Sequence, residues 1–364
     1  MTAISLTASK SVLAASLYSV TDLGALTGQA FTYATGINDS GEVVINSLTS
    51  SFFYSNGLLK KISPLPGDNQ LAVTGINNLG QVVGNSVGRN KFNLNNPFLY
   101  SNGITQPLSI QYAIPYAIND RTQIVGGASG LGPFLYSNGT ATSIGTPGTV
   151  AYGLNNLGQV VGLLSSNTGF LYENGQTTNL GTLPGDAYSV ANDINDSGQV
   201  VGSSGLTGID DGRAFLYSSS TGLENLGRLR PTDLFSAGLG INNLGQVVGF
   251  SGTNHDFYAA NGNGLRAFLY SDNTLYDLND LIAPGSDPGF TLTAASAINN
   301  NGQIVGRGAV NGELHAFLLT PTSSVSVAEP TSGVPILSFG AIVTLFAALK
   351  RKGHSSSAAI QQTS

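Results

Sequence analysis

Residues 241–249 read Ile-Asn-Asn-Leu-Gly-Gln-Val-Val-Gly, and this phrase or a close variant occurs seven times in the 364-residue chain. Successive copies begin 36 to 57 residues apart. A repeat of about 40–50 residues with several short apolar runs is typical of a β-propeller, in which each repeat builds one blade. The copies begin at Ile37, Ile76, Ile118, Leu154, Ile194, Ile241 and Ile298.

Each repeat contains four apolar segments separated by turn residues. The first segment leads into Ile-Asn, where an Asn-Asn-x-Gly or Asn-Asp-x-Gly turn follows and Gly supplies a positive φ angle. Gln-Val-Val-Gly forms the second segment and Phe-Leu-Tyr or a relative forms the third. An Asn-Gly hairpin, as at Asn174-Gly175, leads to the fourth. We therefore predict an all-β, seven-bladed β-propeller with four strands in each blade, over residues 18–321.

The residue before each Ile-Asn phrase indicates which strand is innermost. Six of these seven residues are Gly or Ala, and small side chains suit the crowded axis of a propeller, so we expect the first strand to line it. Asp193 is the only charged residue at this position, and we expect it at the central channel, either solvated or in contact with an ion or ligand. The seven residues are Gly36, Gly75, Ala117, Gly153, Asp193, Gly240 and Ala297.

The two ends of the repeat region complement each other. The seventh repeat has no fourth strand after Leu319, whereas Tyr18–Gly24 matches the pattern of that strand and precedes the first repeat. We expect the N-terminal strand to complete the last blade, because this removes an open sheet edge. In the third repeat Thr122 replaces the turn glycine, which predicts a different turn there.

Insertions between the repeats mark candidate binding loops. The last two intervals are the longest, which places insertions near residues 205–213, 250–265 and 280–290. Loops that vary on a regular scaffold are the usual carriers of specific binding.

Composition and motifs exclude several kinds of function. Only 9% of residues are charged and the net charge is −6, so no basic stripe exists for a nucleic acid. The chain has no Cys, and its three histidines, His255, His315 and His354, are far apart in the sequence, which disfavours a zinc site. The Asn-Asp-Ser-Gly turns at Asn38 and Asn195 offer one carboxylate each, which favours plain β-turns over calcium loops.

The C-terminal region departs from the repeat. Residues 322–333 read as a Ser/Thr/Pro linker, and an apolar segment at 334–349 precedes Lys350, Arg351 and Lys352. We predict a separate transmembrane helix at 334–349 with a basic cytoplasmic tail at 350–364, and a buried terminal helix is the alternative. Residues 1–17 read as a weak or truncated secretory signal, because their apolar run is short.

The repeat resembles the HAF family of extracellular repeats, named for the His-Ala-Phe found here at His315-Ala316-Phe317. The tail resembles a PEP-CTERM sorting signal, with Ala328-Glu329-Pro330 in place of Pro-Glu-Pro. The resemblance implies export, sorting by exosortase-type machinery, and anchoring at a bacterial cell envelope. It implies no defined catalytic activity.

These observations favour a non-enzymatic, envelope-anchored propeller that binds extracellular polysaccharide, a surface protein or matrix, without a cofactor or a nucleic-acid partner. The sequence contains no nucleophile elbow and no phosphate-binding loop. The alternative is a propeller hydrolase or lyase that acts on extracellular polysaccharide. Its carboxylates would come from the late loops, for example Asp211 and Asp256.

Overall fold

The computed structural model describes residues 17–88, 96–208, 211–253 and 264–322. These residues belong to one compact unit, which runs to Thr322. Within the described ranges no helix is both long and apolar enough to cross a membrane. The predicted signal segment up to residue 16, the linker beyond Thr322, the helix at 334–349 and the tail at 350–364 lie outside the described residues.

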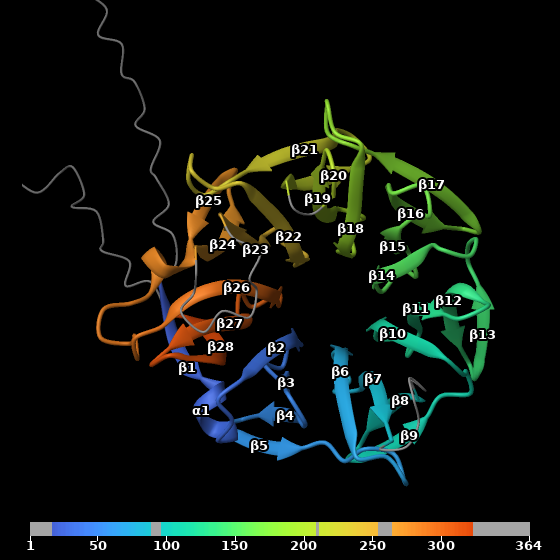
Figure 1. Cartoon of the computed structure of the whole chain (residues 1–364), viewed down its shortest axis with the longest axis horizontal. Helices are drawn as coiled ribbons and strands as arrows, with labels where there is room; N and C mark the ends of the chain where they lie inside the picture. The colour runs from blue at the N-terminus through green and yellow to red at the C-terminus, as the bar shows by residue number, and fades with distance from the viewer. Residues whose placement is uncertain (1–16, 89–95, 209–210, 254–263, 323–364) are drawn as a thin grey trace, which may run out of the picture. The chain divides into compact units, whose positions relative to one another are not determined.

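The described residues form seven four-stranded antiparallel sheets, arranged as blades around a central axis (Figure 1). Blades one to six each use four consecutive strands, and blade seven combines β26, β27 and β28 with β1. This confirms the predicted seven-bladed propeller. The innermost strands are β2 (Thr32–Ile37), β6 (Gln70–Ile76), β10 (Ala113–Ile118), β14 (Val150–Leu154), β18 (Tyr188–Ile194), β22 (Phe235–Ile241) and β26 (Thr291–Ile298).

The other strands follow in the order of the sequence segments. The second strands are β3 (Val43–Ser47), β7 (Val82–Val87), β11 (Ile124–Ala128), β15 (Val160–Leu163), β19 (Val200–Gly205), β23 (Val247–Gly252) and β27 (Ile304–Val310). The third strands are β4 (Ser51–Ser55), β8 (Asn96–Ser101), β12 (Gly132–Ser137), β16 (Gly169–Glu173), β20 (Arg213–Ser218), β24 (Leu265–Ser271) and β28 (Glu313–Pro321). The outer strands are β5 (Leu58–Lys61), β9 (Ile104–Pro107), β13 (Thr140–Ser143), β17 (Gln176–Gly181), β21 (Gly222–Gly227), β25 (Thr274–Asp277) and β1 (Tyr18–Asp22).

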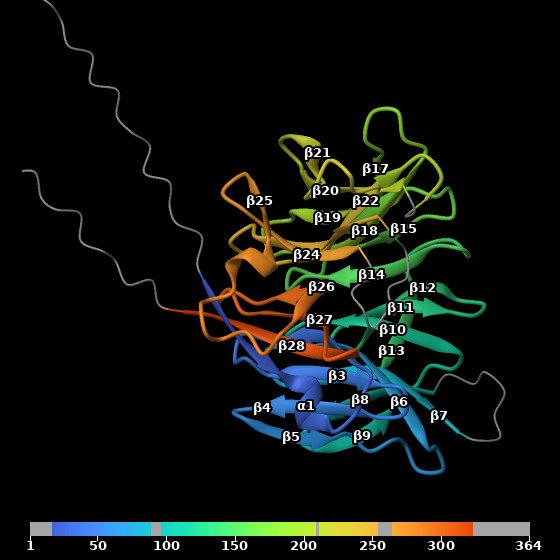
Figure 2. The same cartoon turned by 60° about the vertical axis from the view of Figure 1, so that its left-hand side comes forward.

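The N-terminal strand closes the ring, as predicted. β1 pairs antiparallel with β28, with Tyr18 opposite Pro321 and Asp22 opposite Phe317. Figure 2 shows the blue N-terminal strand running beside β28 into α1. The strand is two residues shorter than predicted, because the side chain of Asp22 accepts the backbone N–H of Ala25 at 2.9 Å and caps a helical turn, α1 (Leu23–Thr27). A 3₁₀ turn at Leu278–Leu281 follows β25.

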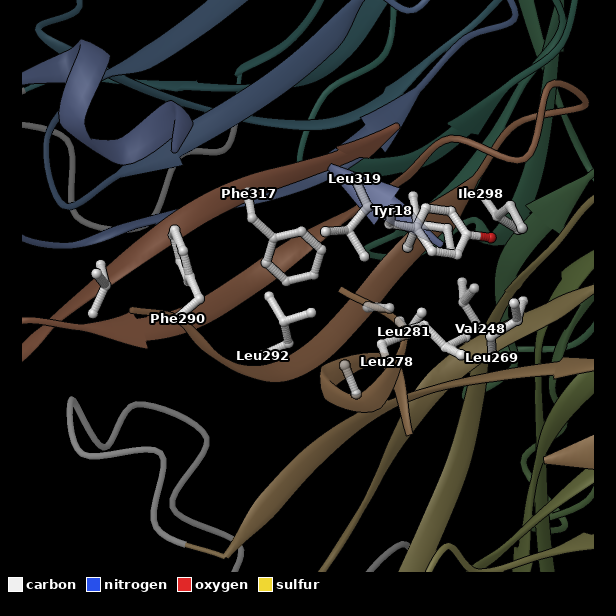
Figure 3. Close-up of a cluster of buried hydrophobic side chains, with 14 residues drawn as sticks. Tyr18, Val248, Leu269, Leu278, Leu281, Phe290, Leu292, Ile298, Phe317 and Leu319 are labelled. Atoms are coloured by element: carbon white, nitrogen blue, oxygen red, sulfur yellow. The ribbon is translucent and has the colours of Figure 1, made fainter. Parts of the chain in front are cut away.

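The hydrophobic core lies between the blades. Figure 3 shows one such cluster, which joins Phe317 and Leu319 of blade seven with Val248 and Leu269 of blade six, and in which Phe317 lies beside Phe290 and Leu292. Tyr18 of the closing strand belongs to the same cluster and is 2% exposed, and its burial raises the pKa of its phenol to about 12. Burial of β1 in this core therefore fastens the two ends of the chain together.

The innermost strands approach their neighbours closely, which explains the small residues in the sequence pattern. A Cβ atom on Gly75 would lie 3.1 Å from the backbone oxygen of Tyr116 in the next blade, and one on Gly240 would lie 3.1 Å from that of Ser296. Each innermost strand also carries a β-bulge against its second strand. The predicted position of the first strand is confirmed.

The turn of the third repeat does not differ from the others, so that prediction is wrong. Thr122 adopts a φ of 58°, and its N–H donates to the oxygen of Asn119 at 3.0 Å, as the N–H of Gly198 does to Asn195. The left-handed backbone is unfavourable for a β-branched residue. Here the Thr122 hydroxyl donates to Oε1 of Gln81 at 2.8 Å, which offsets part of that strain.

Strand alternation gives the propeller two distinct faces. Connections from first to second and from third to fourth strands lie on one face, which we call the turn face. Connections from second to third strands, and from one blade to the next, lie on the other, the loop face. The strands that flank the insertions predicted near 205–213, 250–265 and 280–290 meet these insertions at the loop face, so the turn face is regular and the variation in length falls on the loop face.

Candidate functional site

On the turn face, buried asparagines join all seven blades in a closed ring. The Nδ2 atom of each asparagine donates to the backbone oxygen of its counterpart in the next blade, at 2.9 to 3.1 Å, and Asn299 closes the ring on Asn38. The side-chain oxygen accepts two N–H groups of its own turn, as Asn195 does from Ser197 at 3.1 Å and Gln199 at 2.9 Å. We call this set the asparagine ring; it comprises Asn38, Asn77, Asn119, Asn155, Asn195, Asn242 and Asn299.

The next residue of each turn forms a second closed ring. In each blade the Oδ1 atom of this residue accepts the backbone N–H of its counterpart in the preceding blade, at 2.8 to 2.9 Å. Asp and Asn alternate except at the adjacent Asn243 and Asn300, so no two carboxylates occupy adjacent blades. We call this set the mixed ring; it comprises Asp39, Asn78, Asp120, Asn156, Asp196, Asn243 and Asn300.

The carboxylates of the mixed ring are engaged by protein donors. Oδ2 of Asp196 accepts from the amide of Asn243 at 3.0 Å, and Oδ2 of Asp39 accepts from that of Asn300 at 2.9 Å. The hollow that these rings surround has a volume of about 190 Å³. Among the described residues no group of three His, Asp or Glu side chains is placed to hold a metal ion. The two rings thus hold neighbouring blades together through hydrogen bonds.

Asp193 lies at the inner edge of blade five and lines the same hollow. Its Oδ1 accepts the N–H of Ile194 at 2.9 Å, and its Oδ2 accepts the N–H of Ile241 in blade six at 3.0 Å. Burial raises the pKa of this carboxyl to about 6, and the two N–H donors oppose that rise. The carboxylate therefore links two blades, and both of its oxygens have protein donors.

The charged residue of the His-Ala-Phe position pairs with a carboxylate in three blades. Arg213 contacts Asp186 at 2.7 Å, and Arg266 approaches Asp277 at 3.8 Å. In blade seven His315 is 8% exposed, and its ring nitrogens lie 3.0 Å from Asp22 of the closing strand and 3.0 Å from Glu313. His315 therefore supports closure of the ring.

The loop face carries two adjoining hollows whose described linings contain no charged side chain. The larger, of about 740 Å³, lies over blades one to three and includes Phe31, Tyr33 and Asn85. The smaller, of about 300 Å³, lies between blades three and four and includes Tyr116. Ile114 lines both, so they are neighbours.

Tyrosines gather on the innermost strands beside these hollows. The rings of Tyr116 and Tyr152 meet edge to face, with centroids 5.1 Å apart. Burial raises the pKa of Tyr116, Tyr152 and Tyr188, and for Tyr152 the neighbouring phenols add to the effect of burial. Tyr116 and Tyr152 occupy the bulge positions of their strands, and bulges commonly redirect side chains at binding sites.

The remaining predicted residues do not come together as a site. Asp211 accepts the N–H groups of Leu206 and Thr207 at 3.2 Å, and so holds its own loop in place. Asp256, His255 and His354 lie outside the described residues, as do Ala328-Glu329-Pro330 and Lys350-Arg351-Lys352. The sequence reading missed both rings and the loop-face hollows. Its only signals were the recurring Asn and the single tyrosine in the first strand of repeats one, three, four and five, which is Tyr33, Tyr116, Tyr152 and Tyr188 respectively.

Comparison with known proteins supports the fold. A family model described as a protein of unknown function (DUF3466) matches residues 184–317, which include blades five and six and most of blade seven. No curated protein matches the chain.

Two solved structures from B. thetaiotaomicron resemble the chain. One is the extracellular domain of a protein described as a hybrid two component system, with a TM-score of 0.51 at 14% identity, covering 83% of this chain and 39% of that chain. The other, described as that of a one component system, has a TM-score of 0.51 at 15% identity and covers 82% of this chain and 39% of that chain. This chain thus spans about two fifths of their length, and the likeness concerns the fold alone.

Proposed function

We propose that this protein is an exported, envelope-anchored propeller whose loop face binds an extracellular polymer or a surface partner without catalysis. The observation that carries the proposal is the contrast between the two faces. Hydrogen-bond rings close the turn face, whereas the loop face carries every predicted insertion and two uncharged hollows. A regular scaffold with one variable face is typical of a binding module.

The charged groups described above support binding over catalysis. Asp193 accepts two backbone N–H groups, Asp186 pairs with Arg213, and His315 pairs with Asp22. Asp211 stabilises its own loop. A general acid or base needs a polar atom directed at a substrate, and these atoms are directed at the protein.

Export and anchoring complete the proposal. The His-Ala-Phe repeat, the sorting-type motif at Ala328-Glu329-Pro330 and the apolar segment at 334–349 support sorting by exosortase-type machinery and attachment through a helix, at least transiently. The two extracellular domains from B. thetaiotaomicron show that a fold of this kind is used outside the cell.

Two experiments test this proposal. The purified full chain should bind members of a glycan and surface-protein panel while releasing no product from any glycan. Turnover that is lost in an Asp211→Asn variant would instead establish the hydrolase or lyase alternative. In the native host, cell fractionation should place the full chain in the envelope and a chain ending at Thr322 in the medium. Retention of both forms in the cytoplasm would contradict export.

A further inference from the structure

Asn85, in the larger loop-face hollow, has a buried acceptor without a partner. The residue is 9% exposed, and its Oδ1 atom makes no hydrogen bond in the structure. A buried acceptor without a donor destabilises the fold, so its presence in a regular repeat calls for an explanation.

The equivalent residue of blade one shows what is missing. Asn46 lies at the same position of β3, and its side chain reaches the first strand of the next blade. There Oδ1 accepts the N–H of Val73 at 2.9 Å, and Nδ2 donates to the oxygen of Val73 at 2.8 Å. The asparagine amide and the backbone thus satisfy each other.

Proline removes this partner in the next pair of blades. The residue of blade three that corresponds to Val73 is Pro115, which has no N–H to donate. Its oxygen accepts the hydroxyl of Thr74 at 2.8 Å. The amide of Asn85 is therefore left at the wall of a hollow of about 740 Å³.

The other residues of this hollow limit the chemistry of a ligand. Phe31 and Tyr33 supply aromatic surface and meet edge to face at 6.0 Å, and Gln70 adds a second amide. The described lining has no charged side chain, so a charged ligand would lose its hydration without gaining a counter-charge. Mostly apolar walls with a few fixed polar groups are typical of small-ligand sites.

We propose that this hollow binds one sugar unit of a neutral glycan, with a sugar hydroxyl donating to Oδ1 of Asn85 and the C–H face of the ring packing on Phe31 or Tyr33. This inference rests on the proposed binding function and assigns its site and ligand class. An amide offers one acceptor and one donor, which match a pair of neighbouring hydroxyls. The aromatic rings match the apolar face of a pyranose.

The test uses the purified full chain and calorimetric titration with neutral oligosaccharides of glucose, mannose and galactose, together with oligomers of uronic acids. We expect binding to at least one neutral oligomer and none to the uronic acids. Asn85→Ala should weaken that binding about tenfold, the value of one well-formed hydrogen bond in a buried site.

Pro115→Val is the decisive variant, because it supplies a backbone N–H to Oδ1 of Asn85, as Val73 supplies one to Oδ1 of Asn46. It should raise the unfolding temperature and weaken neutral-glycan binding about tenfold, a combination that misfolding cannot produce. Leu157→Ser on the turn face, where the side chain is 59% exposed, is the matched control and should leave binding unchanged.

Three outcomes would overturn the inference. Glycan binding that is unaffected by Asn85→Ala and Pro115→Val would refute the site and leave the proposed binding function in place. Preference for uronic acids would refute the neutral ligand. Absence of binding to every glycan and every surface protein tested would refute the inference and the proposed function together.

Discussion

Replacement of Asn195 by alanine removes a side chain that is 3% exposed and joins blade five to blade six. Its Oδ1 accepts the N–H groups of Ser197 and Gln199, and its Nδ2 donates to Oε1 of Gln199 at 2.8 Å and to the backbone oxygen of Asn242 at 3.0 Å. Four hydrogen bonds disappear, and only the one to Asn242 is fully buried.

These contacts set the size of the effect. Loss of the buried bond to the oxygen of Asn242 costs about 1–1.5 kcal/mol, since that oxygen keeps the N–H of Gly245 at 3.0 Å as its other donor. The other three groups are partly exposed, and water replaces part of each bond, so each contributes about 0.5 kcal/mol. We therefore expect Asn195→Ala to lower the free energy of unfolding by about 3 kcal/mol.

Two companion variants make the reasoning specific. Asn195→Asp keeps the acceptor oxygen but replaces the donor Nδ2 with a second oxygen, which then faces Oε1 of Gln199 and the backbone oxygen of Asn242. It should therefore lower the free energy of unfolding by about 4 kcal/mol at neutral pH and by less in acid. Ser197→Ala, on the same turn, changes an exposed side chain with no hydrogen bond among the described residues. It should stay within about 0.5 kcal/mol of the parent.

Urea titration followed by far-ultraviolet circular dichroism measures these differences, since the chain has no Trp for a fluorescence probe. If Asn195→Asp were as stable as the parent, or if Asn195→Ala cost no more than Ser197→Ala, the asparagine ring would contribute nothing to stability. The two rings would then be a consequence of blade packing rather than one of its causes.

Two further predictions concern Asp193 and the turn glycines. Burial raises the pKa of Asp193 from 3.8 to about 6, so the folded state holds this proton more tightly than the unfolded chain, and the free energy of unfolding falls as pH rises through about 4 to 6. Because the residue is partly exposed, we expect a fall of about 1–2 kcal/mol, which should be absent in Asp193→Asn. Equal pH slopes in urea titrations of the two proteins would contradict this. Gly198 has a φ of 75°, and a Cβ there would lie 3.6 Å from Oε1 of Gln159. In Gly198→Thr the new hydroxyl should therefore donate to Gln159 as the hydroxyl of Thr122 donates to Gln81, and this variant should be about 0.5–1 kcal/mol more stable than Gly198→Ala in thermal unfolding. The opposite order would show that the Thr122 bond offsets no strain.

Repetition made the architecture readable from the sequence. Strand alternation, turn chemistry and burial are properties of a few adjacent residues, and seven copies repeat the same signal, so blade number, strand count and strand order could be predicted. Closure by Tyr18–Asp22 could be predicted because a missing outer strand at one end and an extra one at the other leave a single economical solution.

The candidate sites could be predicted only in part. Asp193 was found by its charge at an otherwise small position, but its partner Ile241 is 48 residues away, and its role as a link between blades follows from that contact alone. The turn at Thr122 was misread, because its hydroxyl finds Gln81 across 41 residues. Asn85 gave no signal, since its open acceptor exists only because Pro115 of the next blade faces it.

The sequence by itself therefore determined that this chain folds into seven blades, which strand lies innermost and how the ring closes, because local patterns within each repeat carry that information. Only the tertiary structure decided which polar groups are satisfied. Hydrogen bonds of the rings join residues 36 to 261 positions apart, and a bond exists only when both partners are brought within about 3 Å. Whether the asparagine at the fourth position of a second strand joins two blades, as Asn46 does, or lies at an open hollow, as Asn85 does, depends on the neighbouring blade.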